Sequence, residues 1–549
     1  MKPHLKNSLR WLLPLFLVGV TSLVYWNVLG ADFVTWDDQI LVYENPLIDP
    51  AVGADWGQFW RQAYLYLYMP LTYSAWAVLA QMSWQPNAGS LGGDTSPLNP
   101  QYFHVANLIV HLANVILVFS LLRMLVKRDI PALCGAALFA LHPVQVESVA
   151  WISELKGLLC GFFALLALNL HCRQVLNARS TDTIPASRSR FTGAFPVLSA
   201  LCYLLAWLCK PAALGVPIIA FVLDRFMLQR PTWVAFKSLS AWWLIAALFV
   251  LVSIRVQPPV PSAVTPLWTR PLVAADALAF YFGKLLAPVS LGVDYGRTPA
   301  TVLAGPGYIA ILVTLLGLGA IFVFGRQRIW LAAGCLIFIL AVLPVLGLVP
   351  FRFQFYSTVA DRYLYLALLG PALILAFAME EIKFKFFKPM VLSGLCVLAG
   401  LTLVQTTHWH NSWTLFSHAY RLNPRSWASL NNMGSYLQKH NQPDEAMQYF
   451  ESTVKFNPSS SNAWYGMGLL SQRRGRTDDA LRFYKNTVQA EAGHNAAWNN
   501  MGIIYAERRN FEQATLCFEN ALRYSPSPKT EVARNAAKNL AMVRESQGR

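Results

Sequence analysis

Apolar runs separated by short polar loops follow one another through residues 1–407, and an ordinary soluble pattern replaces them afterwards. Because a membrane-spanning helix needs about 20 mostly apolar residues, these runs predict transmembrane helices. Eleven runs fit this description: 11–29, 104–126, 131–151, 157–172, 194–209, 212–228, 238–256, 307–325, 329–349, 363–379 and 390–407. The pattern therefore predicts an all-α chain that begins with a polytopic membrane domain of about 11 spans.

Basic loops predict the orientation of these spans, since Lys and Arg concentrate in cytoplasmic loops. Met1–Arg10 and the loops 123–129, 173–193 and 380–389 are all basic. These four basic segments can all face the cytoplasm only if the further apolar run 272–291 does not cross the membrane. That run carries Asp276 and Lys284. We therefore expect 272–291 to be a re-entrant or interfacial helix. The run 11–29 is read as an uncleaved first span, with a signal peptide as the alternative. Residues 408–549 then lie outside the cytoplasm.

A 34-residue period organises the second domain, residues 408–549. The matching positions are small or aromatic: Gly434, Gly468 and Gly502; Ala446, Ala480 and Ala514; Phe450, Tyr484 and Phe518. This period and composition are typical of tetratricopeptide repeats (TPRs). We expect a half repeat at 410–424, three repeats over about 427–526 and a C-terminal capping helix. Such a solenoid offers a groove for a polypeptide or partner protein, although a rigid spacer or an oligomerisation surface is the alternative.

Composition narrows the classes of function. The chain is 55% apolar and 13% charged, and its net charge of +16 lies largely in the short loops of residues 1–407. The basic residues therefore serve membrane topology, and nucleic acid is not an expected partner. The eight cysteines include no CxxC spacing, so neither disulfides nor thiolate metal sites are expected.

The first outer loop, residues 30–103, contains the sharpest candidate for chemistry. Its segments 53–68 and 70–83 are aromatic and semi-apolar, which predicts helices lying on the membrane surface. Asp37 and Asp38 follow the first span closely. One of two adjacent carboxylates could take the proton of a hydroxyl acceptor as general base while the other holds the acceptor. The alternative is a helix cap or a solvated acidic loop.

A second set of polar residues lies where spans reach the outer face in the predicted topology. They are His142, Glu147, Lys156, Lys210, Asp361, Arg362 and Tyr363. Charges at membrane depth are costly and often functional, and the cations among them could hold a lipid-borne phosphate. Topological anchors or structural ion pairs are the alternative.

The run 104–126 carries His104, Asn107, His111 and Asn114 on one helical face. Hydrogen bonds between helices explain this face better than a metal site, for which no carboxylate or thiolate stands at fitting spacing. We expect no metal and no cofactor.

Several motifs together resemble one family. They are WDDQI with NPLI, MPLTYSAW, FHVANLIVHLANV, LHPVQVESVAWISELK, LCKP and ADRYLYLALLG, followed by the TPRs. This order resembles bacterial relatives of the transmembrane and TPR-containing O-mannosyltransferases over essentially the whole chain. The resemblance implies a C-type glycosyltransferase fold and transfer of a sugar from a polyprenyl phosphate to an extracytoplasmic hydroxyl, first of all on a protein. It also implies a location in a bacterial inner membrane, and a single displacement of the phosphate would make the enzyme an inverting one.

The resemblance assigns roles to residues of this chain. Asp37 and Asp38 would be catalytic, with Asp37 as the base, and Lys156, Lys210 and Arg362 would bind the donor phosphate, supported by His142, Glu147, Asp361 and Tyr363. The chain departs from the family pattern at Met69, Leu155 and Gly157, where Arg, Arg and Asp are frequent. Two other functions stay open: a non-enzymatic membrane-anchored TPR scaffold for an envelope assembly, and a ligase that moves lipid-linked oligosaccharides.

Overall fold

The protein is almost entirely helical in the computed structural model, which describes residues 3–51, 53, 55–86, 96–180, 194–256, 265–305, 307–525 and 530–547. Within these ranges, pairing between extended segments is limited to two isolated bridges, Tyr64–Leu67 and Trp84–Leu98. The chain forms two compact units. Unit 1 comprises Met1–Phe33, Trp56–Ser83 and Asn99–Asn411, and unit 2 comprises Val34–Asp55, Trp84–Leu98 and Ser412–Arg549.

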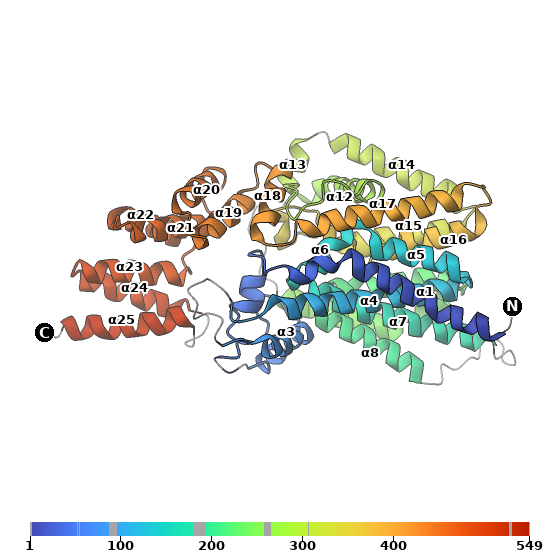
Figure 1. Ribbon diagram of the computed structural model, residues 1–549, viewed down its shortest axis with the longest axis horizontal. Coiled ribbons are helices and arrows are strands. Elements are labelled where there is room, and N and C mark those ends of the chain that lie inside the picture. The colour runs from blue at the N-terminus through green and yellow to red at the C-terminus, as the bar shows by residue number, and fades with distance from the viewer. Residues whose placement is uncertain are drawn as a thin grey trace. The chain divides into compact units, whose positions relative to one another are not determined.

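Unit 1 contains the apolar helices. They are α1 (Pro3–Val24), α2 (Gln58–Arg61), α3 (Pro70–Ser83), α4 (Pro100–Val126), α5 (Asp129–Leu141), α6 (Val146–Ala150), α7 (Leu155–Ser180), α8 (Ala194–Cys209), α9 (Val216–Val222), α10 (Thr232–Ser238), α11 (Ser240–Val256), α12 (Arg270–Leu286), α13 (Pro299–Ala304), α14 (Gly307–Gly325), α15 (Ile329–Val342), α16 (Leu369–Glu381) and α17 (Phe387–Thr407). Helix α4 packs against α5 and α7, and α16 packs against α5 and α15 (Figure 1). Short 3₁₀ turns join several of them: η4 (Pro143–Gln145), η5 (Ile152–Glu154), η6 (Pro211–Gly215), η10 (Arg352–Phe355) and η11 (Asp361–Leu364).

Among the described residues, three helical segments are long and apolar enough to cross a membrane: Pro100–Val126, Ile152–Arg179 and Phe387–Thr407. Two bent pairs raise the count to five if each is one span: Asp129–Leu141 with Pro143–Ala150, bent by 51°, and Thr232–Ser238 with Ser240–Val256, bent by 60°. Other apolar helices, such as Pro196–Cys209, are shorter. Bends and short 3₁₀ turns divide the apolar runs, and a topology of eleven spans stays a prediction.

Close approaches of helix backbones hold this unit together. A Cβ atom added to Gly370 of α16 would lie 2.1 Å from the carbonyl oxygen of Gly334 in α15, so only glycine fits there. Three of the four side chains on the polar face of α4 form hydrogen bonds with other elements. Asn107 donates to the carbonyl oxygens of Val149 and Trp151, and both His111 and Asn114 contact the hydroxyl of Tyr365. The hydrogen-bonding interpretation is therefore confirmed for Asn107, His111 and Asn114.

The first outer loop differs in part from its prediction. A helix over 70–83 is present as α3, but among the described residues of 53–68 only Gln58–Arg61 form an α-helix. Leu65 and Tyr66 adopt φ angles of 48° and 64° at the tip of a tight hairpin closed by the Tyr64–Leu67 bridge. The left-handed region disfavours side-chain-bearing residues, and a helix cannot run through two of them. The prediction of a helix over 53–68 is therefore wrong outside α2.

Unit 2 contains paired helices with the predicted period: α18 (Ser412–Leu422), α19 (Trp427–Lys439), α20 (Pro443–Phe456), α21 (Ser461–Arg473), α22 (Thr477–Ala490), α23 (Asn495–Glu507), α24 (Phe511–Arg523) and α25 (Glu531–Gln547). The repeated glycines let an aromatic ring of the second helix touch the first. A Cβ atom on Gly468 would lie 2.4 Å from the Tyr484 ring, and one on Gly502 would lie 2.6 Å from the Phe518 ring. Pro526, predicted to end the last repeat, lies outside the described residues.

Unit 2 also includes the loop that carries the acidic pair. The backbone N–H of Thr35 donates to the Ser412 hydroxyl at 2.9 Å, and the Trp36 ring lies 5.8 Å from the Phe416 ring. Ser412 and Phe416 belong to α18, the half repeat. The repeat array therefore anchors the segment immediately before Asp37 and Asp38.

Candidate functional site

A cluster of buried charged side chains lies in unit 1, where short turns interrupt the apolar helices. It consists of Glu147, Glu154, Lys156, Lys210, Asp361 and Arg362, all of which keep at most 8% of their surface exposed apart from the partly covered Lys210. Glu147 lies on α6, Glu154 ends η5, and Lys156 lies in the first turn of α7. Lys210 precedes η6, and Asp361 and Arg362 open η11. Residues more than 200 positions apart thus share one site.

Arg362 and Glu147 form the most enclosed ion pair of the cluster. The Glu147 carboxylate accepts from the backbone N–H of Arg362 at 2.8 Å and, through its other oxygen, from the guanidinium. The side chains keep 7% and 2% exposure, respectively. A buried charge is tolerated only when it is paired, so Glu147 fixes both the position and the charge of Arg362.

Glu154 holds two lysines. Lys210 Nζ donates to both carboxylate oxygens, at 3.0 and 2.7 Å, and Lys156 Nζ lies 3.8 Å from Oε1. Burial lowers the pKa of Lys210, and the Glu154 carboxylate opposes this lowering. Glu154 therefore favours the charged form of Lys210 in an apolar environment.

Aromatic rings complete the surroundings of the cations. Trp151 lies beneath both Lys156 Nζ, at 5.1 Å from the ring centroid, and the Arg362 guanidinium, at 5.3 Å. The rings of Phe353 and Tyr363 lie 4.2 and 5.0 Å from the same guanidinium. These cation–π contacts stabilise positive charge without supplying a carboxylate that would compete for an anion.

Asp361 has a neutral partner. The Tyr295 hydroxyl lies 2.8 and 2.9 Å from its two carboxylate oxygens. Burial, followed by the nearby Glu147 carboxylate, raises the pKa of Asp361 well above the ordinary value for aspartate. Asp361 therefore adds less negative charge to the cluster than its side chain alone would suggest.

Lys210 and Arg362 both line a cavity within unit 1. Gly157, Gly161 and Gly215 leave room for it, and Ile219 and Val345 contribute apolar wall. Two cations on an otherwise mostly apolar wall suit a ligand with an anionic head group and an apolar body.

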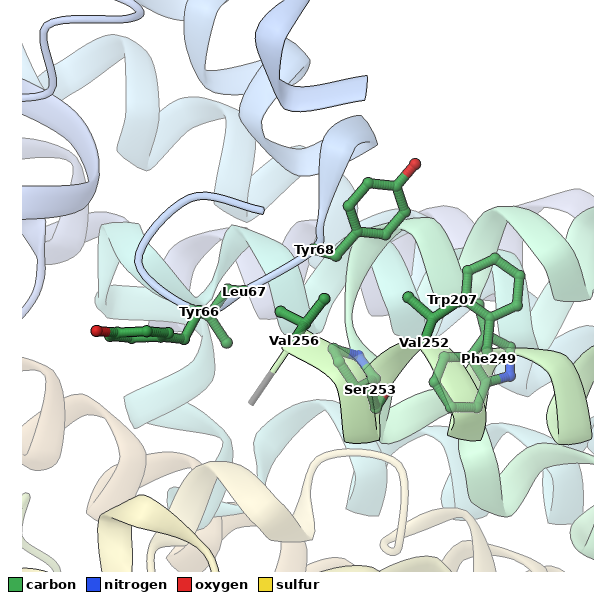
Figure 2. Close-up of a pocket in the computed structure, with 9 residues that line it drawn as sticks. Tyr66, Leu67, Tyr68, Trp207, Phe249, Val252, Ser253 and Val256 are labelled. Carbon is green, nitrogen blue, oxygen red and sulfur yellow. The ribbon is translucent and has the colours of Figure 1, made fainter. Parts of the chain in front are cut away.

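A second cavity begins at Pro211, next to Lys210. Figure 2 shows Tyr66, Leu67 and Tyr68 of the outer-loop hairpin on one side and Trp207 and the α11 residues Phe249, Val252, Ser253 and Val256 on the other. Trp207 and Phe249 stack at 5.3 Å. The residues that line this cavity are almost all apolar or aromatic. One of them, Pro211, directly follows Lys210 of the charged cluster.

The other predicted site residues have defined places. His142 Nδ1 accepts from the backbone N–H of Val144, and its Nε2 lies 3.1 Å from the carbonyl oxygen of Leu285. In unit 2, the buried Asp38 carboxylate accepts from the backbone N–H of Val34 at 3.0 Å, and Asp37 is half-buried. Since the acidic pair and the cations belong to different compact units, their meeting stays a prediction.

Three members of this site, Glu154, Trp151 and Tyr295, were not predicted from the sequence. Glu154 could have been predicted, because it is an acid two positions before Lys156 in a stretch of low charge. Tyr295 could not have been predicted as a site residue. It follows the run 272–291, and the sequence does not decide whether that run crosses the membrane.

The ambiguous run 272–291 is α12 over Arg270–Leu286. Its charged residues are satisfied by the segment that follows. Asp276 pairs with Arg297, and Lys284 donates to the carbonyl oxygens of Val289 and Ser290. Charge on this helix is therefore compensated locally.

Together, the apolar helices and the helical repeats define a multi-pass membrane protein with a C-terminal TPR array. Tetratricopeptide repeat models match residues 428–456 and 496–528, which confirms that the second domain contains tetratricopeptide repeats. The chain is a distant homologue of the TMTC protein O-mannosyltransferases, which confirms the resemblance to transmembrane and TPR-containing O-mannosyltransferases, whereas a bacterial origin stays a prediction. It spans about half the length of the TMTC3 and TMTC1 proteins that it matches.

The relatives are similar over most of this chain. Protein O-mannosyl-transferase TMTC3 of Homo sapiens is 26% identical over 488 residues, covering 79% of this chain and 50% of the relative. Protein O-mannosyl-transferase TMTC1 of Homo sapiens is 24% identical and covers 80% of this chain and 54% of the relative. Protein O-mannosyl-transferase F38B6.6 of Caenorhabditis elegans is 23% identical, covering 80% and 62%.

Two solved structures are also similar in part. The TPR protein YrrB is 20% identical and MamA is 13% identical, with TM-scores of 0.21 and 0.20. They cover 40% and 30% of this chain, and 98% and 97% of their own.

Proposed function

We propose that this protein is a membrane glycosyltransferase that moves a sugar from a polyprenyl-phosphate donor to a hydroxyl of an extracytoplasmic protein. The observation that carries the proposal is the cavity bordered by Lys210 and Arg362. Similarity to proteins named O-mannosyl-transferases supports the reaction class and makes mannose the first sugar to test. The membrane domain would have the C-type glycosyltransferase fold with eleven spans.

In the proposed reaction, the donor phosphate binds at Lys156, Lys210 and Arg362, and its polyprenyl chain follows the aromatic wall between the hairpin and α11. The acceptor oxygen attacks the anomeric carbon and forms the new glycosidic bond. The bond from that carbon to the phosphate oxygen breaks, and the phosphate leaves with the electron pair. Asp37 takes the acceptor proton, and the cations stabilise the leaving phosphate. A single displacement inverts the anomeric centre.

The TPR array would bind the polypeptide acceptor. The contacts of Thr35 and Trp36 with α18 support this role of the TPR array, because they connect the segment before Asp37 to the repeats that would bind the acceptor. The polypeptide acceptor and the general base Asp37 would thus be held by the same compact unit. The enzyme would lie in the bacterial inner membrane with the repeats outside the cytoplasm.

The test compares Asp37→Asn with Asp55→Asn, an exposed acid of the same loop. The purified full-length chain is given polyprenyl-phosphate mannose carrying a radiolabel, together with membrane proteins from cells that lack the chain. Loss of a general base costs about 10²- to 10⁴-fold, so we expect label transfer to fall by at least about 100-fold in D37N and to be unchanged in D55N. Full transfer by D37N would refute the base.

The repeat array makes a non-enzymatic scaffold the second candidate. Deletion of residues 412–549 separates the two. Loss of a partner protein from the membrane complex, with every glycan unchanged, would favour the scaffold. A ligase for lipid-linked oligosaccharides would instead require a diphosphate donor, and we expect no binding of such a lipid.

A further inference from the structure

Segment 382–388, which joins α16 to α17, exposes aromatic rings next to lysines. Phe384 and Phe386 keep 60% and 57% of their surface exposed, and their ring centroids lie 5.7 Å apart. Lys385 Nζ lies 5.6 Å from the Phe386 ring centroid. All three lysines of the segment are exposed: Lys383, Lys385 and Lys388. Exposed rings beside cations are typical of segments at a bilayer surface, where the rings reach the acyl chains and the cations meet head-group phosphates.

The helix that follows the segment presents an apolar surface. Helix α17 is long and apolar enough to cross a membrane, and 11% of its most apolar stretch is buried inside the protein. Met390 and Leu392, close to its start, are 62% and 65% exposed. Since a spanning helix with such a surface contacts acyl chains, the segment directly before it lies where head groups meet the protein.

Two arginines add positive charge around the same end of α16. The Arg328 guanidinium lies 5.8 Å from the Trp330 ring centroid, and Trp330 stacks at 6.4 Å on Phe377 of α16. Arg128 Nε lies 3.5 Å from Glu380 Oε1. Phe377 and Glu380 belong to the last turns of α16, so cations from three loops gather around the end of this helix.

Helix α16 separates this segment from the charged cluster of the candidate phosphate site. Arg362 lies in η11 before the helix begins, and segment 382–388 follows its end. The helix has 13 residues, which corresponds to about 20 Å. A lipid bound at the segment is therefore a different molecule from a donor bound at Arg362, and the predicted span that contains α16 would place the two lipids in opposite leaflets.

We propose that segment 382–388 is a binding site for the head groups of anionic phospholipids. The three lysines contact the lipid phosphates, and Phe384 and Phe386 enter the acyl boundary beneath them. The rings select a lipid over a free phosphate ester, because an ester without acyl chains offers them no apolar surface. This site takes no part in the proposed transfer reaction.

The test measures the affinity of the full-length protein in a neutral detergent for phosphatidylglycerol and phosphatidylcholine by native mass spectrometry. A lysine next to an anionic surface contributes about fivefold in affinity, which is about 1 kcal/mol. Combining Lys383→Gln, Lys385→Gln and Lys388→Gln should therefore weaken phosphatidylglycerol binding by at least about tenfold and leave phosphatidylcholine binding unchanged. The matched control makes the same change at exposed lysines of the repeats and should bind both lipids as the wild type does: Lys455→Gln, Lys485→Gln and Lys538→Gln.

A second variant removes the rings and keeps the lysines. Phe384→Ser combined with Phe386→Ser should weaken the binding of both lipids by similar factors, because contact with acyl chains does not depend on the head group. Phe456→Ser, which removes a 48% exposed ring of α20, should change neither affinity. Glycerophosphoglycerol, which is the head group of phosphatidylglycerol without acyl chains, should not displace the lipid from the wild type.

Hydrogen exchange of the wild type locates the site without any substitution. Amides 383–386 should exchange more slowly in bilayer discs that contain phosphatidylglycerol than in discs of phosphatidylcholine alone, and amides of α25 should exchange equally in both.

Equal affinities of the wild type for the two lipids, equal losses in the two lysine variants, or equal exchange at 383–386 in both discs would overturn the site. Displacement by glycerophosphoglycerol would show a site for phosphate esters and would overturn the lipid assignment. Since no sugar donor is present in these measurements, their failure would leave the proposed function untouched.

Discussion

The Glu147 carboxylate holds Arg362 at two points, the backbone N–H and the guanidinium, across 215 residues of sequence. This arrangement fixes η11 against α6 and presents the guanidinium to the cavity that Lys210 also borders. One carboxylate therefore determines both a tertiary contact and the charge of the candidate phosphate site.

The first prediction concerns this pair. Glu147→Gln leaves the Arg362 charge buried without its counter-charge, and removal of one partner from a buried pair costs about 3–5 kcal/mol. We expect a clearly lower melting temperature of the full-length protein in detergent. The double variant with Arg362→Gln should recover part of the loss, whereas additive losses would show that the two residues do not depend on each other.

A second prediction concerns the repeats. Gly502→Ala places a methyl group against the Phe518 ring, and overpacking of this kind costs about 1–3 kcal/mol. Amide hydrogen exchange in α23 and α24 should become faster. Gly493→Ala is the control, since its nearest neighbour would be the Tyr524 ring at 4.0 Å. Equal exchange in the two variants would contradict the packing.

A third prediction concerns the dependence of the stability of the repeats on pH. His494 caps α23 by accepting the backbone N–H of Ala497 at its Nδ1, and burial lowers the pKa of His494 below its usual 6.5, although Glu491 opposes the shift. The unfolded state then binds more protons than the folded state as pH falls below about 6.5, so stability is lost with falling pH.

We expect faster hydrogen exchange at the start of α23 at pH 5.5 than at pH 7.5, after correction for the intrinsic exchange rate. His494→Asn keeps a capping side chain without a titrating group and should weaken this difference. An unchanged pH dependence in that variant would exclude His494 as its source.

The contact between the acidic loop and the half repeat can be tested separately. Ser412→Ala removes the acceptor of the Thr35 N–H, and loss of such a partner costs about 1–3 kcal/mol. We expect faster exchange of amides 34–38 and slower sugar transfer, with lipid-phosphate binding unchanged. Transfer at the wild-type rate from a loosened loop would contradict the positioning of Asp37 by α18.

The sequence predicted features that repeat or that depend on neighbours along the chain. Gly468 and Gly502 identify the repeats because each packs within its own helix pair, and the period makes that contact visible. Lys210 and Arg362 stood out because charge is rare in apolar surroundings. Both signals are local, so a single sequence contains them.

Other features depend on contacts that no local pattern contains. The role of Glu154 becomes visible only when Lys210, which is 56 residues away, folds onto it. The aromatic, semi-apolar segment 53–68 was predicted to be helical, yet Leu65 and Tyr66 take left-handed angles at a hairpin tip. The association of residues 34–55 with the repeats likewise follows from tertiary contacts such as Trp36 on Phe416.

The most direct measurement is mass spectrometry of extracytoplasmic proteins from cells with the gene, without it, and with only the Asp37→Asn variant. The account predicts that at least one protein loses a hexose on Ser or Thr without the gene and also with the variant, while an Asp55→Asn strain retains it. Identical glycan masses in all four strains would contradict the account.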